Sequence, residues 1–154
     1  MVKKINVEQI RKLREASGAP VIRVKKVLEE FKGSEKKALE VLKKEGFEKA
    51  AKRSERVTSQ GKLFTYSHHT GKVVAVVEIL CETDFVARNE LFEELGKNLA
   101  MQVASMSPRD AKELEKQEFI KDPSKKVSDL VKEVIAKTGE NIKIGRIYRI
   151  EIGR

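Results

Sequence analysis

The sequence predicts an α+β protein, with an N-terminal module of three helices followed by a core in which an antiparallel sheet carries helices on one side. Two observations lead to this prediction. Apolar residues recur with a helical period through residues 6–46, and the period changes to that of strands from Leu63 onward. A chain of 154 residues is long enough for a small domain beside a modest one.

Three short helices are expected in residues 6–46. Asn6 can cap the first helix and Gly18 can end it, while Pro20 suits the first turn of the second. Gly33 followed by Ser34 indicates a stop and a restart, and Gly46 is expected to end the third helix. The apolar positions are Val7, Ile10 and Leu13 in the first helix, Val21, Val24, Val27, Leu28 and Phe31 in the second, and Ala38, Leu39 and Leu42 in the third.

Residues 47–61 are predicted to be a linker. They are basic and compatible with a helix, but they have little apolar stripe, and Gly61 closes the segment. The predicted domains are therefore 1–46, a three-helix module, and 62–154, an α+β core, with the basic helical linker 47–61 between them.

The core is expected to begin with a β-hairpin and a helix. Leu63 to His68 and Lys72 to Cys81 alternate or run apolar on either side of a Thr70-Gly71 turn. The run from Val73 to Cys81 is β-branched and lacks a helical period, which is typical of a buried strand. A helix is then expected from Glu90 to Met106, with Ser107-Pro108 as its stop.

The rest of the core is expected to hold two more helical segments and two strands. Arg109 to Lys116 is a charged helical segment, Phe119-Ile120 is a candidate short strand, and a helix capped by Ser128 ends at Gly139. The last strand is predicted to have one buried face and one wet face. Its apolar residues Ile142, Ile144, Tyr148, Ile150 and Ile152 alternate with Lys143, Gly145, Arg149 and Glu151.

Composition excludes several classes of protein. The chain is 40% hydrophobic and 37% charged, its first residues Met1 to Asn6 have no apolar leader, and no run reaches membrane-spanning length, so we expect a cytoplasmic protein without a membrane partner. The single cysteine, Cys81, cannot form an intrachain disulfide and is expected in the core. His68 and His69, adjacent on a strand, should point to opposite faces and cannot share one metal.

No catalytic motif is present. The sequence lacks a recognisable nucleophile arrangement and a glycine-rich phosphate loop, so we expect no enzyme, no cofactor and no metal site.

The net charge of +9 indicates an acidic partner of some kind. The excess lies in residues 1–46, where a basic surface would attract either phosphate or the acidic face of a protein. An RNA- or ribosome-binding module is the alternative function. Because aromatic residues are only 5% of the chain, base stacking on this surface is disfavoured and nucleic acid is the less favoured partner.

The most informative segment follows the buried strand. Thr83 and Asp84 are helix-capping residue types, so Phe85 is expected at the tip of a strand-to-helix corner, close to Arg88. The pattern alone favours an aromatic folded back onto its own core, and the alternative is an aromatic that inserts into a partner.

Three stretches resemble the elongation factor Ts family, the nucleotide exchange factors for elongation factor Tu. Glu82 to Phe92 (ETDFVARNELF) resembles the family's signature, Ile10 to Leu28 its N-terminal segment, and Thr138 to Ile144 with Arg146 and Arg149 its C-terminal strand. The resemblance implies a ubiquitin-associated-like N-terminal domain. It also implies GDP release from elongation factor Tu without covalent chemistry.

The resemblance also implies the site residues. Thr83, Asp84, Phe85 and Val86 would enter the partner near its magnesium ion, with Phe85 as a wedge. An N-terminal elbow would touch the partner's nucleotide domain through Leu13, Arg14, Gly18, Val21 and Ile22.

The chain departs from the family pattern in two places. In Ser17 to Val24 the family's methionines are missing and Arg23 replaces an acidic residue. Between Ser107-Pro108 and Leu114 the family's longer region is missing, so the chain is interpreted as a short form without the coiled coil or second core subdomain. Such a core could form a homodimer through its last strand, although Lys143 and Arg149 would hinder pairing of an exposed edge.

Overall fold

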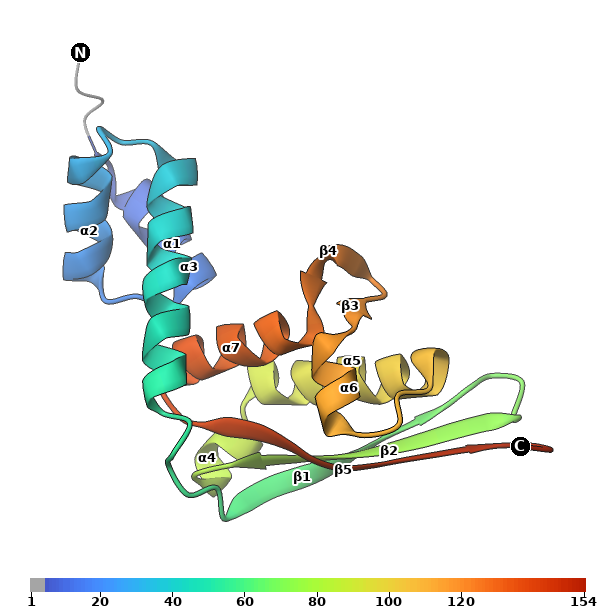
Figure 1. Ribbon diagram of the computed structural model, residues 1–154. Coiled ribbons are helices and arrows are strands. Elements are labelled where there is room, and N and C mark those ends of the chain that lie inside the picture. The colour runs from blue at the N-terminus through green and yellow to red at the C-terminus, as the bar shows by residue number, and fades with distance from the viewer. Residues whose placement is uncertain (1–4) are drawn as a thin grey trace.

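The protein forms an N-terminal helical module and a layered core joined by one long helix (Figure 1). The computed structural model describes residues 5–154, so the expectations that fall on Met1 to Lys4 lie outside the described residues. The elements in chain order are α1 (Val7–Ser17), α2 (Val21–Glu30), α3 (Glu35–Lys52), β1 (Gln60–Ser67), β2 (Val73–Cys81), α4 (Asp84–Ala87), α5 (Glu90–Met106), α6 (Ala111–Lys116), β3 (Glu118–Phe119), β4 (Asp122–Lys126), α7 (Val127–Thr138) and β5 (Ile142–Glu151).

Helices α1 to α3 pack around a small hydrophobic core, as predicted. The Asn6 side chain accepts a hydrogen bond from the Gln9 backbone N–H at 2.8 Å, which confirms the predicted cap of α1. Gly18 ends α1 in the left-handed conformation, also as predicted. The buried residues of this core are Leu13, Val24, Val27, Leu28, Ala38 and Leu42.

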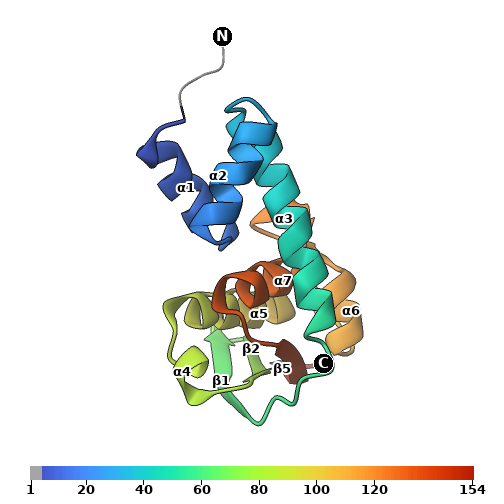
Figure 2. The same ribbon diagram turned by 90° about the vertical axis from the view of Figure 1, so that its left-hand side faces the viewer.

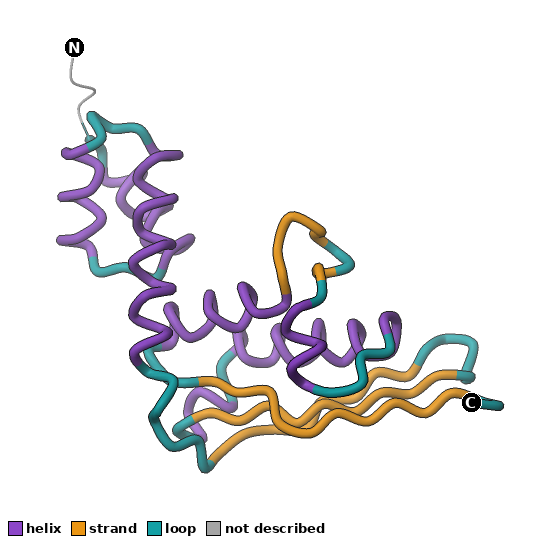
Figure 3. The backbone as a smooth tube through the Cα atoms, in the orientation of Figure 1, coloured by secondary structure: helices purple, strands orange, loops and turns teal. Residues whose placement is uncertain are grey.

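Helix α3 is longer than the sequence predicted, and the expected end at Gly46 is wrong. The helix continues to Lys52, and its residue Ala50 is buried in the second hydrophobic core. A Cβ built on Gly46 would lie 3.1 Å from the Cβ of Ala136 on α7, so glycine here allows two helices to approach closely. Helix α3 therefore reaches from the module into the core, and only residues 53–59 form an irregular connector (Figure 3).

The core contains a three-stranded antiparallel sheet in the order β1-β2-β5. The hairpin of β1 and β2 confirms the sequence prediction. Helices α5, α6 and α7 lie on one face of the sheet, and no described element covers the other face (Figures 1 and 2). The Phe64 and Phe92 rings meet between β1 and α5, with their centroids 5.8 Å apart.

The predicted buried face of the last strand is wrong in its second half. Ile142 and Ile144 are buried, but Tyr148 and Ile150 are 58% and 72% exposed, and Ile152 is similarly exposed. The cause is a β-bulge. Val77 pairs with Ile147 whereas Ile79 pairs with Ile144, so β5 carries one extra residue and its side-chain alternation reverses.

Three further local predictions need correction. Ser128 does not cap α7, because that helix begins at Val127 and the Asp129 carboxylate accepts the Lys126 backbone N–H at 3.0 Å. The short strand β3 ends at Phe119 rather than Ile120 and pairs with β4, which the sequence did not predict. Strand β1 ends at Ser67, so the His68 and His69 rings are not held on opposite faces, and their centroids are 4.2 Å apart.

Cys81 lies in the core as expected, and burial raises the pKa of its thiol to about 11. None of the described helices combines the length and the apolar character that a membrane crossing requires.

Candidate functional site

The corner after β2 presents an aromatic side chain to solvent. Thr83 caps the short helix α4, and Phe85 in the first turn of that helix is 80% exposed. The interpretation favoured by the pattern alone, a ring folded back onto the core, is therefore wrong. Asp84 pairs with Arg88 at 2.5 Å on the surface, while Val86 packs against the core. One side of the corner thus packs against the core through Val86, and the other side exposes Phe85 to solvent.

A carboxylate from another element holds the backbone of this corner. The side chain of Glu140, in the turn between α7 and β5, accepts the Thr83 hydroxyl at 2.5 Å. Its second oxygen accepts the backbone N–H groups of Glu82 and Thr83 at 3.1 and 3.0 Å. Sequence reasoning missed this role, since the pattern identifies Thr83 as a cap but cannot reveal a partner far along the chain.

A groove of about 550 Å³ lies at the elbow between α1 and α2. It brings together three of the predicted elbow residues, Arg14, Gly18 and Val21, and adds two apolar residues that were interpreted only as helix stripe, Val7 and Ile10. The Arg14 side chain makes no hydrogen bond or ion pair within residues 5–154. Ile22 is largely exposed beside the groove.

Leu13 does not belong to this surface. It is 2% exposed and is part of the core of the three-helix module, so its place in the predicted elbow is corrected to a structural one.

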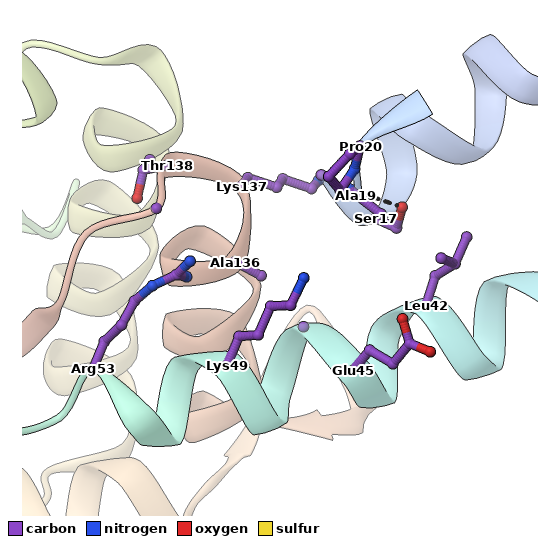
Figure 4. Close-up of a pocket in the computed structure, with 13 residues that line it drawn as sticks. Ser17, Ala19, Pro20, Leu42, Glu45, Lys49, Arg53, Ala136, Lys137 and Thr138 are labelled. Carbon is purple, nitrogen blue, oxygen red and sulfur yellow. Dashed lines mark hydrogen bonds between the residues drawn. The ribbon is translucent and has the colours of Figure 1, made fainter. Parts of the chain in front are cut away.

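The elbow rests against the end of α7, which explains the glycine at position 18. Gly18 has φ +70°, and a Cβ built on it would lie 2.8 Å from the Lys137 Cα. A cleft of about 270 Å³ separates the elbow from α3 and α7, and Lys49, Arg53 and Lys137 contribute to its lining (Figure 4). The module is therefore seated on the core as well as connected to it.

The elbow and α4 lie on the same side of the molecule, the side that faces the viewer in Figure 2. Within residues 5–154 no group of three or more His, Cys, Asp or Glu side chains is arranged to hold a metal ion. The site offers an exposed aromatic residue and a basic, partly apolar groove, features that are typical of protein recognition surfaces.

Comparisons with known proteins identify the family of the chain. The family model described as elongation factor TS matches residues 82–154, which begin at the corner. The chain is 39% identical to elongation factor Ts of Leptospira biflexa, over 97% of this chain and 98% of that protein. The chain belongs to the elongation factor Ts family. It is also 38% identical to elongation factor Ts of Thermotoga neapolitana and 36% identical to that of Nitratidesulfovibrio vulgaris, with at least 97% of each chain covered.

The chain is shorter than the relatives with which it aligns. The alignment with the Leptospira protein runs over 194 positions, whereas this chain has 154 residues, so the relative contains positions without a counterpart here. The chain is a short member of the elongation factor Ts family.

Arg23, which was interpreted from the sequence as a departure from the family pattern, makes its contacts within the chain itself. Its guanidinium donates to the Glu45 carboxylate on α3 at 2.9 Å and pairs with Glu30 at 3.4 Å. The hydrogen bond from Arg23 holds the pKa of Glu45 below its ordinary value. Arg23 therefore ties α2 to α3 and is engaged away from the groove lining.

Proposed function

We propose that this chain is a guanine nucleotide exchange factor that promotes GDP release from elongation factor Tu and forms no covalent bond with it. Membership of the elongation factor Ts family gives the class of partner. The observation that carries the proposal is Phe85, a large apolar side chain exposed at a corner whose backbone is held by Glu140.

Phe85 is proposed to act as a wedge, supported by Thr83, Asp84 and Val86 around it. Burying a phenylalanine contributes about 1.5–3 kcal/mol. If Phe85 is buried only when the partner's magnesium-holding groups have moved, the free energy of burial favours the partner with weakened nucleotide binding. It then does not add equally to the affinity for the nucleotide-bound and nucleotide-free partner. Mg²⁺ requires near-octahedral geometry and takes phosphate oxygens of the nucleotide among its ligands. A small displacement of the groups that hold the ion should therefore weaken GDP binding.

The elbow is proposed to be the second contact, through Arg14, Gly18, Val21 and Ile22. We propose that residues 1–46 act as a ubiquitin-associated-like domain and residues 62–154 as the core domain, with 47–61 between them. The two separate hydrophobic clusters support this division, although Ala50 packs in the core cluster. The seating of Gly18 against Lys137 supports a fixed spacing between the two contacts.

The direct test is release of labelled GDP from the cognate elongation factor Tu. We expect the protein to accelerate release at catalytic concentrations, and unchanged release would contradict the proposal. Family membership does not favour the alternative, a basic RNA-binding module. That alternative would show affinity for RNA falling steeply with salt, in proportion to the phosphates contacted.

We further propose that a second copy of the chain covers the outer face of the sheet, and that the protein works in the cytoplasm. The face carries exposed apolar side chains on all three strands, including Leu63, Val74 and Ile150. This surface differs from the edge pairing that Lys143 and Arg149 would hinder.

A further inference from the structure

Three segments that are distant in the sequence meet behind the Phe85 corner. They are the end of β2 with Glu82 and Thr83, the turn after α7 with Glu140 and Asn141, and the connector at residues 53–56. Asn141 is almost completely buried between them. Its side-chain N–H groups donate to the Ser54 carbonyl at 3.3 Å and to the Arg56 carbonyl at 2.8 Å.

The first two segments hold each other reciprocally. The Glu140 carboxylate accepts the backbone N–H groups of Glu82 and Thr83. In return, the Glu82 carboxylate accepts the backbone N–H of Asn141 at 2.7 Å. Arg56 closes the cluster, because its guanidinium pairs with Glu82 at 3.5 Å and donates to the Gly139 carbonyl at 3.3 Å.

We propose that Glu140 and Asn141 are positioning residues for nucleotide exchange. Glu140 fixes the corner that carries Phe85, and Asn141 fixes the connector that carries the N-terminal module, so the two partner contacts keep one geometry. The proposal rests on the proposed function of Phe85 and the elbow. Holding both contacts before binding removes an ordering cost from the encounter and from the nucleotide-releasing step.

The corner depends on this support because its own packing is small. Helix α4 has four residues, and Ala87 is its one buried residue. The exposed Phe85 ring contributes little to the core. Without the Glu140 carboxylate, the half-buried N–H groups of Glu82 and Thr83 can turn to water, so the position of the corner is affected more than the stability of the fold.

The test measures catalysed GDP release by Glu140→Ala, by Glu140→Gln and by a matched control, Glu113→Ala. Glu113 also accepts a backbone N–H, that of Arg109, but lies on α6 outside this cluster. We expect Glu140→Ala to lower the exchange rate about 10- to 100-fold. We expect Glu140→Gln to keep most of the rate, because its amide oxygen still accepts the two N–H groups. Glu113→Ala should change the rate less than about twofold.

A double-mutant cycle separates positioning from stability. If Glu140 acts through Phe85, then Glu140→Ala should have less than a twofold further effect in a chain that already carries Phe85→Ala. If Glu140→Ala folds poorly, Thr83→Val serves as a second variant in the same cycle. It replaces the hydroxyl by a methyl group, and so removes the bond to Glu140 together with the cap on the Val86 N–H. Equal fractional losses in both backgrounds would overturn the proposal, since they indicate a general loss of folded protein.

Asn141 is tested in the same way against the other contact. Asn141→Ala should raise the protein concentration needed for half-maximal exchange about tenfold, and this effect should vanish in a chain carrying Ile22→Ala at the elbow. Trypsin should also cut the Asn141→Ala chain faster at Arg53 or Arg56 than it cuts the unchanged chain. An unchanged cleavage rate and an unchanged exchange curve would overturn the role of Asn141.

The outcomes also distinguish the positioning role of Glu140 from the proposed wedge function of Phe85. If Phe85→Ala reduces exchange and Glu140→Ala does not, the positioning role is wrong and the wedge stands. If Phe85→Ala itself leaves exchange unchanged, both are wrong.

Discussion

At the scale of single residues, Phe85 is the side chain whose replacement separates binding from folding. Because Phe85 is 80% exposed, Phe85→Ala should leave the melting temperature nearly unchanged. It should reduce catalysed GDP release about 10- to 100-fold, since about 1.5–3 kcal/mol of partner-dependent burial is lost. Thermal melts beside stopped-flow release of labelled GDP measure both quantities.

Phe92 is the matched control for this change. It is fully buried beside Phe64, so Phe92→Ala should lower the free energy of unfolding by about 3–5 kcal/mol. GDP and the exchange factor each lower the affinity of elongation factor Tu for the other, and linkage requires the two factors to be equal. Phe85→Ala should therefore reduce both factors by the same amount. A Phe85→Ala protein that melts far lower than the unchanged chain would contradict the wedge.

Arg14 tests the elbow by charge. Its side chain has no ion-pair partner in the described part of the chain, so Arg14→Ala should leave stability within about 0.5 kcal/mol. The association rate with elongation factor Tu should fall, and it should fall more at low salt than at high salt. Arg109→Ala, an exposed arginine on the flank of α6, is the control. Equal rate losses for the two variants would indicate a net-charge effect and not a contact at the elbow.

The sequence alone predicted the roles of some site residues and not of others. The capping residues Asn6 and Thr83 were predicted because their hydrogen bonds are made within three residues. The role of Glu140 was not, because the N–H groups that donate to its carboxylate lie 57 and 58 residues away in the chain. The burial of Leu13 could not be separated from that of Val21, since both belong to the apolar stripes of their helices and only packing distinguishes them.

At the scale of elements, α5 shows what periodicity predicts and what it omits. Its bounds were predicted, but Gly96 gave no signal in the sequence. In the structure a Cβ on Gly96 would lie 2.3 Å from the Phe64 ring, so the absent side chain makes room for β1 to pack on α5.

Gly96→Ala should therefore destabilise the fold, although alanine is the better helix former. We expect a loss of about 1–3 kcal/mol in the free energy of unfolding, measured by urea titration. Lys97→Ala, at the exposed neighbouring position, should change it by no more than about 0.5 kcal/mol. A Gly96→Ala protein as stable as the unchanged chain would mean that Phe64 moves aside without cost.

The mistaken elements share one physical cause. Gly46 and the bulge in β5 look ordinary in sequence, because a glycine can end a helix or admit a neighbouring helix, and an extra residue in a strand leaves the apolar alternation intact. Which alternative holds is decided by contacts with α7 and with β2, and local pattern contains neither.

At the scale of the whole molecule, helix α3 connects the two hydrophobic clusters, because it contributes a buried residue to each. Leu42 belongs to the module's cluster and Ala50 to the core's cluster, on the same helix. The module that carries the elbow is therefore joined to the core by a continuous helix and a short hydrogen-bonded connector. The pattern that predicted a division at residues 47–61 could not reveal that α3 continues past Gly46 to Lys52.

The last whole-molecule feature is the uncovered face of the sheet, which we expect a second copy to bury. Exposed apolar side chains gathered on one face are costly for a monomer. In analytical ultracentrifugation the protein should sediment as a dimer at micromolar concentration. Ile150→Lys should shift it to monomer, because a charge would be buried in the proposed interface.

Val57→Lys is the control for this change, since Val57 is at least as exposed as Ile150 but lies on the connector before β1, outside the sheet. It should leave the dimer intact. The folded core should survive Ile150→Lys, because the bulge in β5 points this side chain away from the helices. A protein that sediments as a monomer at every concentration would show that another partner, or solvent alone, covers this face.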